Sequence, residues 1–174
     1  CLSANDVNAL QAKLEEAMDE GIKISCFDSA CNPDSRQIFI NQAGTNAVGQ
    51  ALLDAVLDIA GGEGQFAILS ATSQAANQNA WIDAMKTIME ADEKYSKLEL
   101  VEVAYGDDEP QKSTDQTAAL LDKYPDLKVI CAPTTVGIAA AAKYLQDNNS
   151  TCKLTGLGLP SEMLEYTGDD DAHS

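Results

Sequence analysis

Histidine and basic residues are scarce in this sequence. The one histidine, His173, is next to last in the chain, and Lys and Arg number 11 against 28 Asp and Glu. A Ser-His-Asp or Cys-His catalytic arrangement needs a histidine beside the nucleophile, which this position makes implausible. The formal net charge of -17 repels phosphate backbones, so we expect no nucleic-acid partner.

Several local signatures are also missing. No Gly-x-Ser-x-Gly elbow, no Gly-x-Gly-x-x-Gly following a strand and no Walker loop occurs in the chain. No uncharged apolar run approaches the roughly 18 residues of a membrane span, and no leader segment is visible. With no Cys-x-x-Cys pair and one histidine, a metal site is not expected. We therefore predict no catalytic residue, no metal and no cofactor, and so no enzyme.

The five cysteines show no disulfide framework. Cys26 and Cys131 lie inside apolar runs and are typical of small buried hydrophobic residues. Cys26 and Cys31 could approach each other around a loop. The odd number and the spacing nevertheless favour free thiols.

What the chain does have is a regular alternation of apolar segments over 174 residues. We expect one domain, or one domain with part of another. Short apolar runs predict strands at 22–27, 38–40, 66–69, 98–103, 129–132 and 152–157. Helical spacing predicts helices at 6–21, 48–59, 81–89, 114–123, 135–145 and 161–166. Asp6 is a plausible N-cap of the first of these and Gly21 a plausible C-cap.

This alternation predicts an α/β fold with parallel sheets flanked by helices on both faces. The strands are apolar without alternation, as expected where both faces of a sheet are covered. The glycine-rich run 61–64 precedes a strand and so indicates a helix stop, not a phosphate loop. The chain starts like a strand entered halfway along, and 168–174 does not close a fold. We therefore expect a truncated chain.

In an open parallel sheet, ligands bind beyond the carboxyl ends of the strands. The residues that follow the predicted strands are polar and mostly neutral. They are Asp28, the group Asn77, Gln78 and Asn79, and the run Pro133, Thr134 and Thr135. One carboxylate with amides and hydroxyls suits a neutral, polyhydroxylated ligand.

Each candidate also has a structural alternative. Asp28 could cap a turn, Asn77 or Asn79 could cap the helix that follows, and Thr134 or Thr135 could cap the helix at 135–145. Trp81 could stack on a sugar ring, although its place on a helical stripe favours the core. The acidic run 107–109 lies in a predicted turn and is expected to be solvated.

Longer strings carry a resemblance to a known family. The segments 38–42, 67–72, 77–81, 124–128, 132–141 and 155–160 resemble the periplasmic sugar-binding proteins of ABC importers, of the ribose-binding type. Within that type the chain is most similar to the branch of rhamnose-binding proteins and quorum-sensing autoinducer receptors. The resemblance runs from Ser3 to about Tyr166.

The resemblance implies a periplasmic-binding-protein type I fold, with two lobes that close on a ligand. Residues 1–38 would form the later part of the N-terminal lobe, 39–167 most of the C-terminal lobe, and 168–174 an acidic tail at the truncation point. Complete members of the family are much longer than this chain.

The resemblance also implies a binding site. Asp28 matches the sugar-binding aspartate, Asn77 and Gln78 match the acid–glutamine pair of the autoinducer receptors with an amide in place of the acid, and Pro133 matches their proline. Thr135 stands where those receptors have alanine, and Gly158 where many ribose-type binders have aspartate. These differences lean towards a deoxyhexose such as rhamnose.

The implied function is the extracytoplasmic solute-binding component of a bacterial ABC importer, periplasmic or lipid-anchored, with a neutral monosaccharide as ligand and a membrane permease as partner. Two alternatives stay open. One is the effector-binding domain of a sugar-responsive transcriptional repressor, and the other is a small flavodoxin-like α/β enzyme. We expect the fragment to bind sugar weakly or not at all, and to dimerise through its exposed sheet edges.

Overall fold

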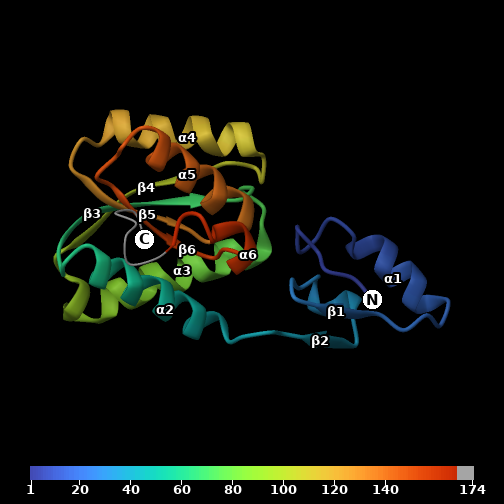
Figure 1. Ribbon diagram of the computed structural model, residues 1–174. Coiled ribbons are helices and arrows are strands. Elements are labelled where there is room, and N and C mark those ends of the chain that lie inside the picture. Colours follow the sequence, from blue (N-terminus) through green and yellow to red (C-terminus); the bar gives the residue numbers. More distant parts are fainter. Residues whose placement is uncertain (168–174) are drawn as a thin grey trace.

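The chain forms two separate parallel β-sheets, each with its own helices (Figure 1). The computed structural model describes residues 1–167. The smaller sheet pairs β1 (Ser25–Phe27) with β2 (Ile38–Ile40), and the larger has the strand order β4-β3-β5-β6. All pairings are parallel, which confirms the predicted α/β class.

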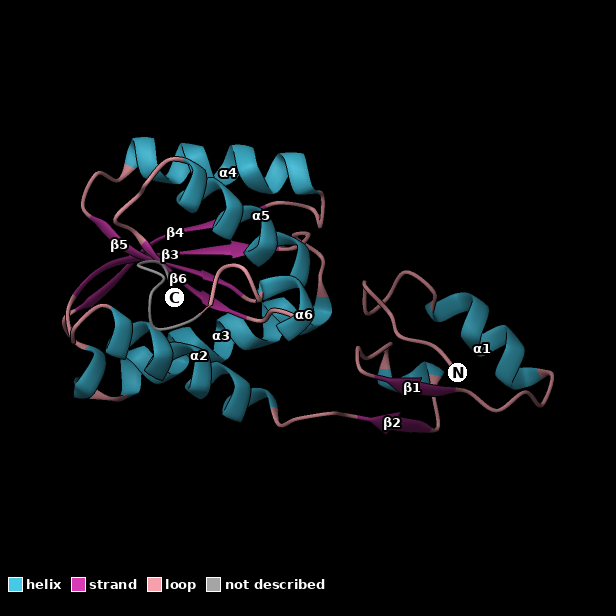
Figure 2. Ribbon diagram, in the orientation of Figure 1, coloured by secondary structure: helices cyan, strands magenta, loops and turns pink. Residues whose placement is uncertain are grey.

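The remaining elements follow the predicted order (Figure 2). The strands of the larger sheet are β3 (Gly64–Ser70), β4 (Leu98–Tyr105), β5 (Leu127–Ala132) and β6 (Lys153–Gly156). The helices are α1 (Gln11–Asp19), α2 (Thr45–Ile59), α3 (Ala76–Ala91), α4 (Pro110–Lys123), α5 (Thr135–Asp147) and α6 (Pro160–Met163), with short 3-10 turns at Pro33–Ser35 and Glu93–Tyr95.

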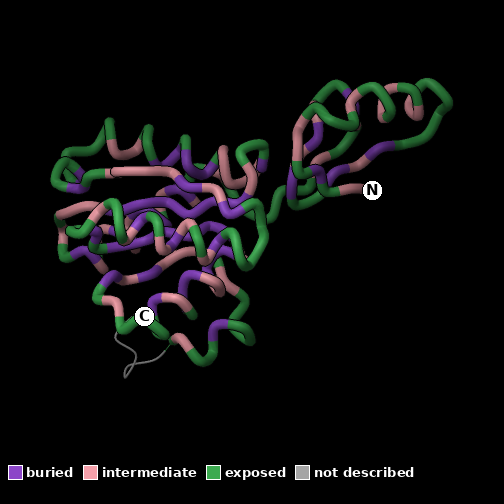
Figure 3. Tube along the Cα trace, turned by 90° about the horizontal axis from the view of Figure 1, so that it is seen from above, coloured by how far each residue is buried: buried purple, intermediate pink, exposed green. Residues whose placement is uncertain are grey.

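The larger sheet is covered on both faces because its central strands send alternate side chains to opposite sides. In β3, Phe66 and Ile68 pack with α2 and α3, whereas Ala67 and Leu69 pack with α4 and α5. All four side chains are fully buried, and the burial along the trace in Figure 3 follows the same layers. The predicted helices on both faces are therefore confirmed for this sheet.

Trp81 belongs to this core and is 7% exposed, so the structural alternative to sugar stacking is correct. The predicted helix stop is also confirmed. After α2 the backbone turns through Gly61 and Gly62, at φ 71° and 87°, and their N–H groups donate to carbonyls of the last helical turn. Such positive φ values close a helix with little steric cost only at glycine.

The first helix begins later than predicted. Asp6 does not cap it, because its carboxylate accepts hydrogen bonds from the N–H groups of Asn8 (2.7 Å) and Ala9 (2.9 Å) in a preceding turn. These local bonds offer the backbone an alternative to the helix, which starts at Gln11. The segment 22–24, predicted as strand, lies outside β1.

Cys26 and Cys31 form a disulfide, with Cα atoms 6.5 Å apart, so the prediction of free thiols is wrong for this pair. The chain reverses directly after β1 through Asp28, at φ 59°, and this turn brings the two cysteines together. Cys131 and Cys152 are buried free thiols, and burial raises the pKa of each to about 12.

The N-terminal segment has a small core. Its buried cluster is Ala4, Cys26 and Cys31, and Ile24 is buried beside β1. The opposite face of its sheet leaves Phe27, Ile38 and Ile40 about half exposed or more. Over residues 1–167, no helix combines the length and the hydropathy needed to span a bilayer. The predicted acidic tail, with His173, lies outside the described residues.

Candidate functional site

Asp28 lies at the carboxyl end of β1, where its side chain meets donors from several segments. Its Oδ1 accepts hydrogen bonds from Gln42 Nε2 at 2.9 Å and from Asn77 Nδ2 at 3.5 Å. Its Oδ2 accepts from Ser3 Oγ at 3.2 Å. The carboxylate is exposed and is held by neutral donors, so its acceptor sites face groups that a ligand hydroxyl can replace.

Asn77 and Gln78 lie in the first turn of α3, at the carboxyl edge of the larger sheet. Asn77 faces Asp28, and Gln78 Nε2 donates to the backbone oxygen of Pro133, 3.2 Å away. Four of the five predicted residues are therefore neighbours in space: Asp28 contacts Asn77, and the next residue, Gln78, contacts Pro133. They come from the two sheets and meet on one side, as the strand-end rule requires.

No side chain of this edge caps a helix, although Thr134 does occupy the N-cap position that one structural alternative gave it. The N-cap positions of α3 and α5 are Ala75 and Thr134, and neither helix has a side-chain cap. Asn79 donates instead to the carbonyl oxygen of Ser73 at 2.9 Å. Thr135, the fifth predicted residue, is the first residue of α5 and is half buried.

Thr134 is 4% exposed, and its hydroxyl donates to the carboxylate of Asp108. The acidic turn at 107–109 is therefore not merely solvated, since one of its carboxylates holds the loop between β5 and α5. Asp107 forms an exposed ion pair with Lys112. Both aspartates have φ near 54°, an uncommon conformation for residues other than glycine.

A second contact joins the two sheets beside Asp28. The backbone oxygen of Asn5 accepts from the N–H of Ala76 at 2.9 Å, and its side chain donates to Thr72 Oγ1 at 3.5 Å. Leu2 forms a parallel β-bridge with Cys26. Asn5 therefore follows a short strand-like pairing, as Asp28 follows β1.

Four residues of the site were not predicted from the sequence. They are Ser3, Asn5, Gln42 and Asp108. For Gln42 and Asp108 the signal is the rule already applied to Asp28, because Gln42 follows β2 and Asp108 follows β4. Ser3 and Asn5 follow none of the predicted strands. No three His, Cys, Asp or Glu side chains within residues 1–167 are grouped so that they could hold a metal ion.

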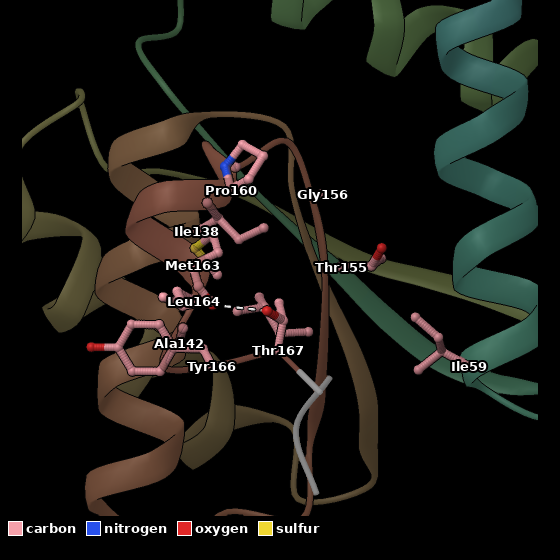
Figure 4. A pocket seen from close by; sticks show the side chains of 12 residues that line it. Ile59, Ile138, Ala142, Thr155, Gly156, Pro160, Met163, Leu164, Tyr166 and Thr167 are labelled. Carbon is pink, nitrogen blue, oxygen red and sulfur yellow. Dashed lines mark hydrogen bonds between the residues drawn. The ribbon is translucent and has the colours of Figure 1, made fainter. Parts of the chain in front are cut away.

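A pocket of about 540 Å³ lies elsewhere, along β6, α5 and α6 (Figure 4). Its lining is mainly apolar and includes Ile138, Leu154, Met163 and Tyr166. None of the five predicted site residues lines it. An apolar lining leaves sugar hydroxyls without hydrogen-bond partners, so this pocket does not suit the predicted ligand.

The whole chain matches one known protein family. A model of the periplasmic binding protein domain matches residues 1–174. The chain belongs to this family. The resemblance read from the sequence is thereby confirmed, and the type I binding-protein fold fits the two parallel α/β sheets.

Solved structures of this family include close relatives of the chain. An ABC transporter solute binding protein from Clostridium phytofermentas with bound L-rhamnose is 61% identical, with a TM-score of 0.95 over 99% of this chain and 54% of that one. A sugar ABC transporter protein from Actinomyces odontolyticus is 45% identical, with a TM-score of 0.75 over 95% of this chain and 54% of that one.

A more distant structure shares the fold. LsrB from Clostridium saccharobutylicum, in complex with AI-2, is 22% identical, with a TM-score of 0.83 over 95% of this chain and 54% of that one. The chain spans about half the length of each of these three structures.

Proposed function

We propose that this chain is part of the solute-binding component of a bacterial ABC importer and that its ligand is a neutral monosaccharide resembling L-rhamnose. The observation that carries the proposal is the line formed by Asp28, Asn77, Gln78 and Pro133 between the two sheets. The relative with bound L-rhamnose, at 61% identity, supports this sugar class.

The sequence predicts lobes of residues 1–38 and 39–167, and we propose to move the boundary between them to residue 40, so that β2 stays with β1. The separation into two sheets supports two lobes. Because β2 pairs with β1, we set the crossing between the lobes just after Ile40, where the chain runs through Asn41 to Gly44 into α2 (Figure 1).

In the proposed mechanism Asp28 accepts hydrogen bonds from two sugar hydroxyls, while Asn77, Gln78 and the Pro133–Thr135 loop contact the ring from the other lobe. The sugar closes the lobes because only the closed form lets it contact both at once. Micromolar affinity, about 8 kcal/mol, is sufficient for such a receptor.

The partner of the closed form would be the membrane permease of the importer, and the protein would act outside the cytoplasm, in the periplasm or lipid-anchored. Membership of a periplasmic binding protein family supports both. In this role the protein binds its sugar and catalyses no reaction.

Self-association through sheet edges remains a prediction. The edge strands of the larger sheet are β4 and β6, whose unpaired backbone groups could pair with a second chain. Light scattering of the 174-residue chain would measure its mass.

The test is calorimetry of L-rhamnose on the full-length protein that carries this chain. Asp28→Ala should abolish measurable binding, while the melting temperature of the ligand-free protein should fall only by the small backbone cost of alanine at φ 59°, since the carboxylate is exposed. Asp34→Ala, another exposed acid of the same segment, is the matched control and should bind normally. A large loss of ligand-free stability in Asp28→Ala would instead make Asp28 a structural residue.

A further inference from the structure

The disulfide encloses the residue that carries the proposed sugar-binding carboxylate. Cys26 lies in β1 and Cys31 five positions later, and Asp28 lies between them. The two cysteines are 0% and 1% exposed. The crosslink therefore closes a short covalent ring that includes Asp28, with the disulfide buried and the Asp28 side chain exposed.

This turn is tied to its neighbours by backbone groups. The N–H of Asp28 donates to the Ile40 oxygen at 3.1 Å, and the N–H of Ser29 donates to Ser3 Oγ at 3.3 Å. The carbonyl of Ser29 accepts from the N–H of Ala4 at 3.2 Å. Asp28 itself lies at φ 59°, a left-handed conformation that is uncommon for L-residues, although Asp adopts it more readily than most.

Little apolar packing is present to hold the turn in this conformation. The core cluster beneath the turn has three buried residues, two of which are the disulfide cysteines themselves, and only partly buried side chains, those of Leu2, Leu14 and Phe39, pack against it. Segments with few buried contacts open at low free-energy cost, whereas a crosslink removes open conformations. The disulfide is thus a covalent restraint on the turn, beside the hydrogen bonds that hold it.

We propose that the Cys26–Cys31 disulfide positions Asp28 for ligand binding, and that reduction of the disulfide by a dithiol weakens sugar affinity. In this reaction the dithiol supplies two electrons and two protons, the S–S bond breaks to two thiols, and the dithiol becomes a disulfide. Affinity falls because the ligand must then restrain the turn itself. The affinity part of this proposal rests on the proposed function.

The coupling must also act in reverse. An attacking thiolate reaches the buried sulfurs only when the turn opens. A sugar held by Asp28 keeps the turn closed. If reduction weakens sugar binding by a given factor, bound sugar must oppose reduction by the same factor.

The positioning role is tested without any ligand, by hydrogen exchange on the 174-residue chain. In the Cys26→Ala/Cys31→Ala variant, the amides of Asp28 and Ser29 should lose protection by at least about tenfold. The amide of Gln37, which donates to the Ile24 oxygen at 3.0 Å outside the ring, is the internal control and should change little. Unchanged exchange at Asp28, or an equal loss at Gln37, would overturn the proposal.

The affinity arm uses L-rhamnose calorimetry on the full-length protein. The double variant should bind about tenfold more weakly than the oxidised protein, and Cys1→Ala, which removes an exposed free thiol, should bind as the unmodified protein does. Added L-rhamnose should shift the thiol–disulfide equilibrium towards the disulfide. Equal affinity of the oxidised protein and the folded variant would refute the coupling. No binding by the oxidised protein would refute the proposed function instead, and the exchange result would still decide the positioning role.

Discussion

The Asp28 carboxylate and the Asn77 amide meet between the two sheets, with Oδ1 and Nδ2 3.5 Å apart. The same Oδ1 accepts a shorter bond, 2.9 Å, from Gln42. Hydrogen bonds weaken towards 3.5 Å, so the contact with Asn77 is the weaker of the two. A ligand hydroxyl that enters between the sheets would replace Asn77 at low cost, while Gln42 keeps Asp28 oriented.

Asn77→Asp is expected to weaken L-rhamnose binding by the full-length protein. The substitution places a second carboxylate near Asp28, and two like charges at about 4 Å repel by about 1 kcal/mol in water, or roughly fivefold in affinity. Because salt screens exposed charges, the loss should shrink at high ionic strength. Calorimetry in low and high salt measures both effects.

Asn79→Asp makes the same change of charge two positions along the same helix. Asn79 contacts the Ser73 carbonyl and not Asp28, so this control should show no comparable salt-dependent loss. If the two variants behave alike, the net charge of α3 is responsible, and the contact between Asn77 and Asp28 has no role in binding.

Removing the Asp108 carboxylate should destabilise the loop between β5 and α5. In Asp108→Ala the hydroxyl of Thr134, 4% exposed, loses its acceptor, and an unsatisfied buried donor costs about 1–3 kcal/mol. Urea unfolding of the chain measures this loss in the free energy of unfolding.

Asp107→Ala is the matched control, because both aspartates have φ near 54° and so share the backbone cost of the substitution. Asp107 forms an exposed ion pair with Lys112, which contributes at most about 1 kcal/mol. A loss for Asp107→Ala as large as that for Asp108→Ala would mean that the turn itself, and not the bond to Thr134, sets the stability.

Most of the fold could be predicted from the sequence because the central strands of the larger sheet, β3 and β5, are buried on both faces. Runs such as Phe66–Leu69 stay apolar without alternation, and this pattern identifies parallel strands between helices. The strand-end rule then predicts that Asp28, Asn77 and Pro133 lie on one side, beyond the carboxyl ends of the strands.

The missed features depend on backbone geometry that composition does not reveal. The disulfide spans a turn in which Asp28 has a positive φ, and the sequence alone does not reveal this conformation. The contacts of Asn5 with Thr72 and Ala76 depend on how one sheet lies against the other. The late start of the first helix depends on Asp6 bonding in a turn before the helix.

Thiol labelling separates the five cysteines into classes. In the native chain near neutral pH, iodoacetamide should modify Cys1 alone, because burial raises the pKa of Cys131 and Cys152 to about 12 and holds both as thiols. Denaturation without reductant should also expose Cys131 and Cys152 to the label, and added reductant should then expose Cys26 and Cys31. Mass spectrometry counts the labels, and full labelling of the unreduced, denatured chain would exclude the disulfide.

Asp54 should make the stability of the chain depend on acid pH. Hydrogen bonds from Lys94 at 2.5 Å, from Tyr95 at 2.7 Å and from Gln50 at 3.1 Å lower the pKa of Asp54 from 3.8 to about 2. A lowered pKa in the folded state stabilises the fold above the unfolded value. This contribution should be present above about pH 4 and should disappear as the pH falls towards 2.

Asp54→Asn removes this charge with little change of shape. Its unfolding free energy should fall below that of the unmodified chain near neutral pH, by no more than about 1 kcal/mol because the ion pair is half exposed. The two curves should converge towards pH 2, as urea unfolding at several pH values would show. Asp58→Asn, one turn further along α2, is the control and should not reproduce this dependence. A difference that persists unchanged at pH 2 would assign the effect to the shape of the side chain and not to its charge.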